Sequence, residues 1–290
     1  HDDLVLEDLY QSVAEIIPVS WQFPDFTAAR ITIDGKQYKT NNWKESRWMQ
    51  FVDIKSSKAI VGKIEVVYLE ENSKLDDNPF LIEEKQLLEV IAERIGKIID
   101  RISAEKNISK KNWLINGLKQ LSDKMQGDQK TDELSANIIT FLAKYLHAQV
   151  GALYVKDDKK EQLSISGTYA YPISKDNNCM FGEGLVGQAA FENEMIILSD
   201  LPEDYITINS ALGKTIPNNL IVSPFTHDGE VLGVIELGSI NEFSDNELDF
   251  IKTSMKDIAI AINSSIARVK MKVLLDKTLQ QSEQLQSQQE

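Results

Sequence analysis

The residues best placed to do chemistry in this 290-residue chain lie between positions 169 and 219. Gly182, Gly184 and Gly187 form the pattern G-x-G-x-x-G, which in a dinucleotide-binding domain cradles a pyrophosphate. That fingerprint needs a strand directly before the first glycine and an acidic residue about 20 positions later. Here a polar loop precedes Gly182, and Asp200 comes too early. The pattern therefore favours a tight turn that enters a helix near Leu185.

Cys179 is the only cysteine, so the chain cannot form an internal disulfide, which fits a reducing, cytoplasmic compartment. Catalysis by this thiol would need a nearby cation or a helix N-terminus to lower its pKa. The glycine turn could supply the helix N-terminus. A small-molecule-modifying enzyme that uses Cys179 therefore stays open as an alternative to a cysteine without a chemical role.

Two long loops on either side of the glycine turn predict a ligand pocket, because long loops in compact domains are usually functional. These loops carry aromatic, apolar and amide side chains that suit a pocket wall. The same residues could instead form a filled core under a lid, which would leave an interaction-only scaffold. The expected lining residues are Tyr169, Tyr171, Cys179, Phe181, Leu185, Tyr205, Ile208, Leu212, Asn218 and Asn219.

The charge balance bears on the choice of partner. The chain has 31 Lys and Arg against 45 Asp and Glu, a net charge of −14. Because phosphates must be neutralised, this acidity disfavours nucleic acid and anionic membrane surfaces as partners. No run of about 18 apolar residues occurs, so we expect no direct membrane insertion in this segment. The start at His1, without Met or a visible signal peptide, suggests a piece of a longer protein.

The apolar spacing predicts one pattern of elements twice. In the first half we expect a helix over 4–17, strands over 28–33, 37–40, 48–54 and 60–69, and a long helix from Phe80. In the second half we expect a helix over 134–146, strands over 149–155, 162–168, 195–200, 220–225 and 231–238, and a long helix from Ser244.

A sequence repeat supports this duplication. The segment 61–66, V-G-K-I-E-V, matches 232–237, L-G-V-I-E-L, and each is followed by Phe-x-x-x-Glu at the start of a long helix. We therefore predict an α+β protein with two units of one fold, each an antiparallel sheet flanked by helices. The expected boundaries are a short, divergent domain over 1–104, a helical linker over 105–126, a second domain over 127–267 and a coiled-coil helix over 268–290.

The C-terminal helix has the signals of a coiled coil. Ser244 and Glu247 form a capping box. Apolar residues step in heptads from Leu248 to Ile262 and continue from Ile266 in a shifted phase, as in a stutter. No Pro or Gly interrupts the segment before Glu290. We expect the chain to form a homodimer through this helix and the linker helix.

Taken together, these residues resemble a GAF domain from about Thr131 to Ala267. The resemblance is carried by the Gly182–Gly187 turn, the 195–200 strand, the strand end at Pro224-Phe225, the 231–237 strand and Phe243-Ser244-x-x-Glu247. The segments 117–128 and 138–154 and the glutamine-rich end 285–290 resemble the input region of bacterial hybrid sensor histidine kinases. The first unit resembles a shorter GAF-like or PAS-like sensor.

The resemblance implies a sheet of about six strands with a ligand pocket on one face, but it does not identify the ligand. Cyclic-nucleotide-binding relatives carry an Asn-Lys…Phe…Asp-Glu pattern, whereas Asn241 precedes Glu242 here. Bilin-binding relatives place His after the attachment Cys, whereas Met180 follows Cys179. Sulfoxide-reducing relatives use several cysteines. Cyclic nucleotide and bilin are therefore disfavoured, and no cofactor is required.

The chain is thus expected to be the non-catalytic sensory region of a two-component sensor histidine kinase. It would bind an unknown small molecule and relay that event to a kinase module elsewhere in the full-length protein. His1, His147 and His227 are too few and scattered for a metal site, and His227 lies in a turn unsuited to phosphoacceptance. Because glycine-rich ATP-binding motifs are also absent, we expect no catalytic residues in this chain.

Overall fold

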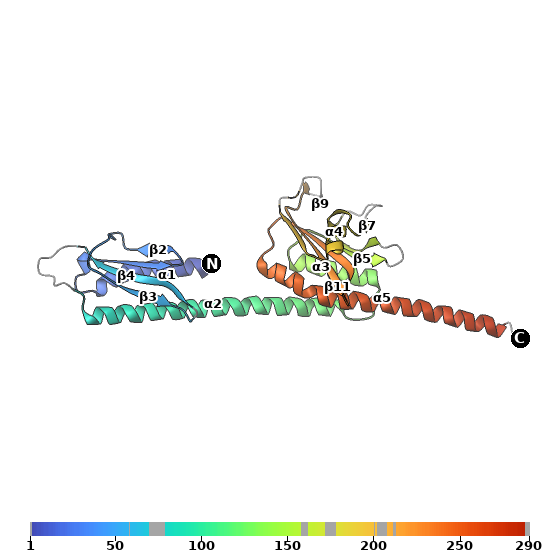
Figure 1. Ribbon diagram of the computed structural model, residues 1–290, viewed down its shortest axis with the longest axis horizontal. Helices are drawn as coiled ribbons and strands as arrows, with labels where there is room; N and C mark the ends of the chain where they lie inside the picture. The colour runs from blue at the N-terminus through green and yellow to red at the C-terminus, as the bar shows by residue number, and fades with distance from the viewer. Residues whose placement is uncertain are drawn as a thin grey trace. The chain divides into compact units, whose positions relative to one another are not determined.

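The computed structural model describes residues 2–57, 59–69, 79–157, 162–171, 178–199, 201, 208–210 and 213–287 (Figure 1). The chain divides into two compact units, residues 1–109 and 110–290. Both units contain an antiparallel sheet with helices packed against it. The α+β fold class with antiparallel sheets, predicted from the spacing of apolar residues, is confirmed.

Unit 1 begins with a helix and continues into a four-stranded sheet of order β2-β1-β4-β3. One face of this sheet packs on α1 and the first turns of α2 through buried residues such as Ala14, Ile31, Ile64 and Leu88. Its elements are α1 (Asp2–Ile16), two 3₁₀ turns (Ile17–Ser20 and Pro24–Phe26), β1 (Thr27–Ile33), β2 (Lys36–Lys39), β3 (Met49–Lys55), β4 (Ile60–Tyr68) and α2 (Ile82–Met125).

Unit 2 contains the end of α2 and a six-stranded sheet of order β7-β6-β5-β12-β11-β8. A separate two-stranded hairpin joins β9 and β10. The elements are α3 (Thr131–Tyr145), β5 (Val150–Asp157), β6 (Gln162–Tyr169), β7 (Cys179–Met180), α4 (Gly184–Glu192), β8 (Ile196–Ser199), β9 (Ile208–Ser210), β10 (Gly213–Thr215), β11 (Asn219–His227), β12 (Glu230–Ser239) and α5 (Asp245–Ser287).

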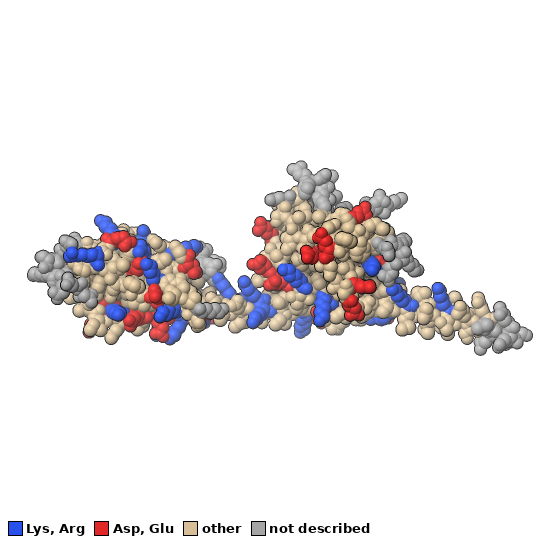
Figure 2. Space-filling view, viewed as in Figure 1, with Lys and Arg blue, Asp and Glu red and all other residues tan. Residues whose placement is uncertain are grey.

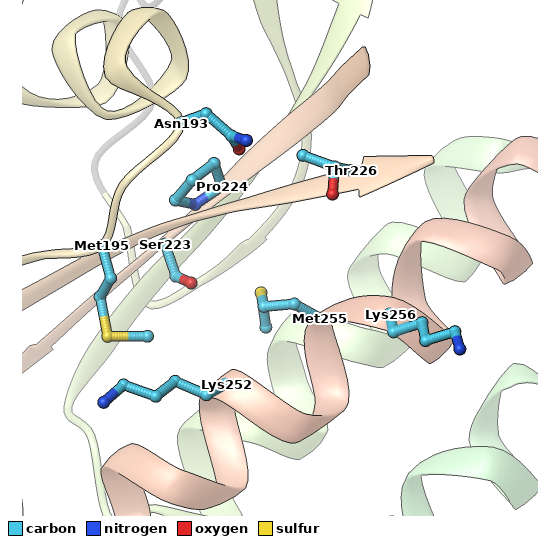
Figure 3. A pocket seen from close by; sticks show the side chains of 8 residues that line it. All are labelled: Asn193, Met195, Ser223, Pro224, Thr226, Lys252, Met255 and Lys256. Carbon is cyan, nitrogen blue, oxygen red and sulfur yellow. The ribbon is translucent and has the colours of Figure 1, made fainter. Parts of the chain in front are cut away.

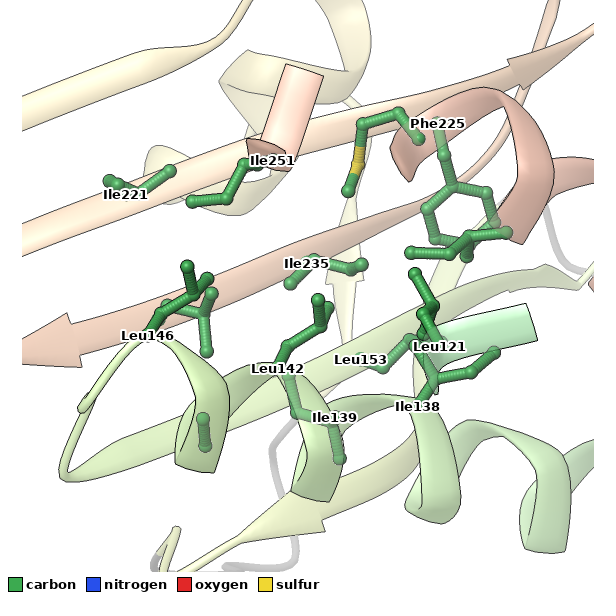
Figure 4. Packing of buried hydrophobic residues seen from close by; sticks show 14 of the residues in the cluster. Leu121, Ile138, Ile139, Leu142, Leu146, Leu153, Ile221, Phe225, Ile235 and Ile251 are labelled. Carbon is green, nitrogen blue, oxygen red and sulfur yellow. The ribbon is translucent and has the colours of Figure 1, made fainter. Parts of the chain in front are cut away.

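Two apolar clusters cover the two faces of the unit 2 sheet. On the helix face, α3, α5 and the end of α2 bury Leu121, Ile138, Ile235 and Ile251 (Figure 4). On the opposite face, which we call the α4 face, strand residues such as Val234 pack with α4. Because side chains alternate along a strand, each central strand contributes to both clusters.

Corresponding strands have the same neighbours in the two units. The pairings β2-β1, β1-β4 and β4-β3 of unit 1 match β6-β5, β5-β12 and β12-β11 of unit 2. Gly62 and Gly233 occupy matching positions, since an added Cβ would lie 2.1 Å from a backbone oxygen of the neighbouring strand in both cases. The two repeated segments thus lie on equivalent central strands.

The helix starts also follow the repeat. The Glu247 carboxylate accepts hydrogen bonds from the backbone N–H and hydroxyl of Ser244, at 2.8 and 2.7 Å. The Glu84 carboxylate accepts from the N–H of Leu81 at 2.8 Å at the start of α2. Both are capping interactions at the first turn of a long helix.

Three short strands were not predicted. β7 and the β9–β10 hairpin lie in segments that the sequence indicated as loops. They have two or three residues each, too few for an alternation of apolar and polar residues to be recognised.

The surface of the described residues carries both signs of charge. Figure 2 shows Lys and Arg interspersed with Asp and Glu over this face, with no broad basic area among the atoms described there. The exclusion of nucleic acid stays a prediction. Over the described part of the chain, none of the helices combines the length and hydropathy needed to cross a bilayer.

We predict that Gly233→Ala destabilises unit 2 by about 3 kcal/mol, because its Cβ would overlap Tyr154 O at 2.1 Å and the Phe225 ring at 2.3 Å. Gly229→Ala is the control: nothing lies within 4 Å, but its φ of +83° should cost about 1 kcal/mol. Hydrogen exchange of β11 and β12 peptides in increasing urea measures both without interference from unit 1. Equal destabilisation by the two variants would contradict the steric argument.

Candidate functional site

The glycine turn connects β7 to α4 and shapes one border of the α4 face. Gly182 and Gly184 have φ of +82° and +63°, in the left-handed region that favours glycine. At Gly187 an added Cβ would lie 2.2 Å from the backbone oxygen of Met180. The three glycines therefore allow a short strand to enter a helix within a few residues, as the sequence predicted.

A buried polar cluster lies within the apolar α4 face. Glu236 of β12 is 2% exposed. Its Oε2 accepts hydrogen bonds from the hydroxyls of Tyr154, at 3.2 Å, and Tyr171, at 3.0 Å. The two hydroxyls are 3.1 Å apart. Buried carboxylates require such partners, since desolvating an uncompensated charge is costly.

Burial and the Glu236 charge raise the pKa of Tyr154 and of Tyr171 well above the usual value for tyrosine. Both phenols therefore keep their protons at neutral pH and act as hydrogen-bond donors to the carboxylate. The cluster presents a positioned acid and two neutral hydroxyls in an otherwise apolar setting. Such a site suits recognition of a polar group on a small molecule.

Two local irregularities decide the faces to which Tyr169 and Tyr171 point. Leu153 pairs with Gly167 and Tyr154 with Ile165, so Ser166 is an extra residue in β6. Such a bulge reverses the face to which the following side chains point. Tyr169 consequently packs with the helix-face cluster.

Tyr171 returns to the α4 face after Ala170, whose φ is +49°. The prediction that Tyr169 and Tyr171 line one pocket is therefore wrong for Tyr169. Simple alternation along a strand predicts one face for both residues, and the left-handed Ala170 between them breaks that alternation.

Four of the predicted lining residues do share the α4 face: Tyr171, Cys179, Phe181 and Leu185. Asn219 is buried at the start of β11, where its amide donates to the Ile240 carbonyl at 3.4 Å. Asn218 is exposed.

Three other predicted residues cannot be placed in this site. Tyr205 and Leu212 lie outside the described residues, and for Ile208 only the backbone, in β9, is described.

The sequence did not identify Tyr154 and Glu236 as residues of the candidate site. Glu236 had a readable signal, because it is the one acid inside the apolar run V-L-G-V-I-E-L, where a charge is unexpected. Tyr154 had none, since an aromatic residue in a strand is ordinary.

The corresponding acid of unit 1 is neutralised differently. Glu65, at the position matching Glu236, bonds Arg30 and Lys63 at 2.7 Å each. Burial alone would raise the pKa of Glu65, but these cations outweigh it and lower that pKa. The guanidinium of Arg30 also lies 4.4 Å from the centre of the Trp43 ring. Ala152 takes the place of Arg30 opposite Glu236.

Metal chemistry finds no support among the residues that the structure describes, where no group of three His, Cys, Asp or Glu could hold an ion.

The fold is an α+β domain with helices on one face of its sheet and a polar cluster under a short helix on the other. Residues 128–263 match the family model described as GAF domain, and this part of the chain is a GAF domain. GAF domains are a ligand-binding and signalling fold. The resemblance seen in the sequence is confirmed at this level.

Solved structures similar to this chain include GAF domains and an enzyme. The GAF domain of a phosphoenolpyruvate-protein phosphotransferase from Coxiella burnetii is 21% identical, with a TM-score of 0.47, covering 54% of this chain and 96% of its own. The corresponding Acinetobacter domain is 15% identical, with a TM-score of 0.45 and coverages of 54% and 97%.

A free methionine-R-sulfoxide reductase from Neisseria meningitidis, solved with its substrate, is 18% identical. Its TM-score is 0.43, and the coverages are 55% of this chain and 91% of its own. The comparison with curated proteins found no match.

We predict that Cys179 reacts slowly with iodoacetamide at pH 7–8. Burial, with the charges of Glu183 and Glu236, raises the pKa of the thiol to about 11. The thiolate is the reactive form, so its fraction near neutral pH should be about 100-fold below that of an ordinary cysteine, and the rate should rise until the pH passes 11. A pH–rate profile of alkylation measures this. A plateau below pH 8 would contradict it.

Proposed function

We propose that this chain is a non-catalytic sensory module whose GAF unit binds a small ligand at the α4 face and relays that event through α5. The buried Glu236–Tyr154–Tyr171 cluster carries the proposal. A structural core has no need of a carboxylate at its centre, since apolar residues of similar volume are often at least as stabilising. A ligand that bonds this cluster would explain why polar groups occupy the position.

The route from site to helix runs through the central strands. Glu236 faces the proposed ligand, while its neighbours Ile235 and Leu237 pack in the helix-face cluster with α5. A change in the position of β12 on ligand binding would therefore alter its packing against Ile251 and Ile258 of α5. A ligand can shift such an equilibrium only by binding one arrangement more tightly than the other.

Beyond the domain, α5 has the length and composition of an output element. Near the end of the domain, the Ser265 hydroxyl of this helix donates to Gln129 O at 3.0 Å and Arg268 pairs with Asp128 at 3.5 Å. After these contacts the helix continues to Ser287, and its residues 267–282 are exposed. We propose that it leads into the dimerisation helices of a histidine kinase module in the full-length protein.

The first unit is, in this proposal, a shortened relative of the GAF domain. The matched strand pairing, the paired glycines and the equivalent acids Glu65 and Glu236 support a common origin. We propose that unit 2 is the sensing unit, because it carries the Glu236–Tyr154–Tyr171 cluster on the α4 face.

The enzymatic alternative that uses Cys179 is not favoured by its surroundings. A nucleophilic thiol needs a lowered pKa, whereas burial and two acids raise the pKa of this one. The free methionine sulfoxide reductases are enzymes of similar fold, but fold similarity alone does not transfer a reaction.

To test ligand binding, we would purify the protein from its own host and measure its intact mass by native mass spectrometry. We expect a small-molecule adduct in the wild type, and at least about fivefold less of it in Tyr171→Phe, which removes one donor from the site.

Tyr145→Phe is the matched control, because its hydroxyl bonds Trp113 O at 2.7 Å on the helix face. We expect this variant to keep the adduct. A wild-type protein without any adduct would instead favour the interaction-only scaffold.

We also propose that the chain forms a homodimer through the linker helix and α5. Ile260, Ala267 and Leu274 recur every seven residues on α5, and each is exposed. Met271, at 69% exposure, lies between the last two of these at coiled-coil spacing. An isolated helical segment of this kind is marginal in water unless its apolar stripe is covered.

Leu274→Glu should raise the dimer dissociation constant at least about tenfold, because two exposed leucines would no longer be buried in the dimer. Gln280→Glu, elsewhere on the same helix, adds the same charge and should leave association nearly unchanged. Sedimentation equilibrium measures both variants. The homodimer proposal is wrong if the wild-type protein stays monomeric in sedimentation equilibrium at a concentration 100-fold above that of the native mass spectrometry experiment.

A further inference from the structure

The loop that joins α2 to α3, residues 126–130, connects three helices of unit 2 through Gln129. The side-chain amide of Gln129 donates to the carbonyls of Lys124, at 2.9 Å, and Gln126, at 2.6 Å, at the C-terminal end of α2. The last carbonyls of a helix have no partner within the helix, so this amide caps α2.

Gln129 also bonds α3 and α5. Its side-chain oxygen accepts from the amide of Asn137 in α3 at 2.8 Å, and its backbone oxygen accepts from the hydroxyl of Ser265 in α5 at 3.0 Å. The Ser265 hydroxyl lies 3.2 Å from the hydroxyl of Thr131, the first residue of α3. One residue therefore holds the end of α2, α3 and α5 together.

The bond from Ser265 to this loop is a specific link, because a buried serine in a helix can satisfy its hydroxyl within its own helix. Ser254 of α5 does so: it is 0% exposed, and its hydroxyl donates to the carbonyl of Ile251 at 2.9 Å. Ser265 is also 0% exposed, yet its hydroxyl donates to Gln129 outside the helix.

A second contact between the same three helices lies at Gly117 of α2. An added Cβ at Gly117 would lie 2.5 Å from the ring of Tyr145 in α3 and 2.7 Å from the ring of Phe250 in α5. A larger residue would push α2 away from both rings or displace them. The Tyr145 hydroxyl also donates to the carbonyl of Trp113 in α2 at 2.7 Å. Thus α2 is held against α3 and α5 at two places along its length.

The packing of α5 differs on the side that faces β11. A cavity of about 460 Å³ lies there, with Ser223 of β11 on one side and Lys252 and Met255 of α5 on the other (Figure 3). It borders the part of β11 beyond Val222, where β8 no longer pairs with β11. In the same turns of α5, the Phe250 ring lies 5.0 Å from the ring of Tyr145 and 5.6 Å from that of Trp113, centre to centre. This part of α5 is therefore packed more closely against α2 and α3 than against the end of β11.

We propose that Gln129 and Ser265 couple α2 to α5, so that unit 2 relays a movement of α2 to α5 through its helices. This relay needs no ligand at the α4 face, because none of its hydrogen bonds involves a residue of the sheet or of α4. Gln129 is a positioning residue in it, since its side chain fixes the loop whose carbonyl accepts from Ser265.

The relay gives α5 a second input. One input is the polar cluster on the α4 face, which reaches α5 through β12. The other is α2, whose first turns pack in the core of unit 1. A change in unit 1 that moves α2 would then reach α5 even when the α4 face is unchanged.

The test is hydrogen exchange of the full chain, measured by mass spectrometry on peptides from the end of α2 (119–125) and from α5 (261–268). Gln129→Ala removes side-chain bonds to α2, the loop and α3, and should speed exchange in 261–268 about fivefold. Ser265→Ala, whose lost hydroxyl bonds no residue of α2, should speed exchange in 119–125 by a similar factor. Each effect is expected at the helix that the altered group does not bond, because coupling between two sites is reciprocal.

Two variants serve as matched controls. Ser254→Ala removes an equally buried hydroxyl that bonds within α5, and should leave exchange in 119–125 unchanged. Gln149→Ala removes a side chain that bonds His147 O and Ile240 N beyond the other end of α3, and should leave exchange in 261–268 unchanged. Circular dichroism checks that each variant is folded.

Three results would overturn the proposal. Changes confined to the helix that each altered group bonds would show that the loop is only a local cap. Equal effects of the control variants would show only a general loss of stability. Loss of the reciprocal effects when either variant is combined with Tyr171→Phe would show that the route runs through the α4 face.

Discussion

The structure of unit 2 depends on β12 being packed tightly on both faces. Its residues alternate between the helix-face cluster, reached by Ile235 and Leu237, and the α4 face, reached by Val234 and Glu236. Gly233 permits this packing, because any larger residue would meet the neighbouring strand and the Phe225 ring. A strand so constrained cannot move on one face without displacing side chains on the other.

The same constraint appears in unit 1, but with another electrostatic outcome. Both units place a glutamate on the central strand, three residues after the tightly packed glycine, and both bury it to 2% exposure. In unit 1 a cross-strand arginine and a lysine on the same strand compensate the charge. In unit 2 neutral tyrosines bond the acid. The same strand position thus carries a buried glutamate in both units, with basic partners in unit 1 and tyrosine partners in unit 2.

The sequence was informative wherever many residues repeated one physical signal. The sequence predicted the long amphipathic helices, the alternating strands and the capping acid Glu247, because periodicity and capping depend on local sequence. The glycine turn could be predicted because few structures require three glycines at that spacing.

The faces of single side chains were less predictable. Ser166 inserts one residue into β6 and Ala170 adopts a left-handed conformation, and neither residue type signals such behaviour. The cavity beside Ser223 depends on where β8 stops, which is a property of the assembled sheet and of no local pattern.

Helix α5 is held by the domain core as far as Ser265 and then runs on for 22 residues to Ser287. At 1.5 Å per residue, this length is roughly 33 Å. The contacts of Ser265 and Arg268 lie at the base of this length. If the helix tilted by roughly 5° at these contacts, its far end would move sideways by roughly 3 Å. A sideways movement of that size is comparable with half the rise of one helical turn, so small rotations at the domain would correspond to large displacements at the end of the helix.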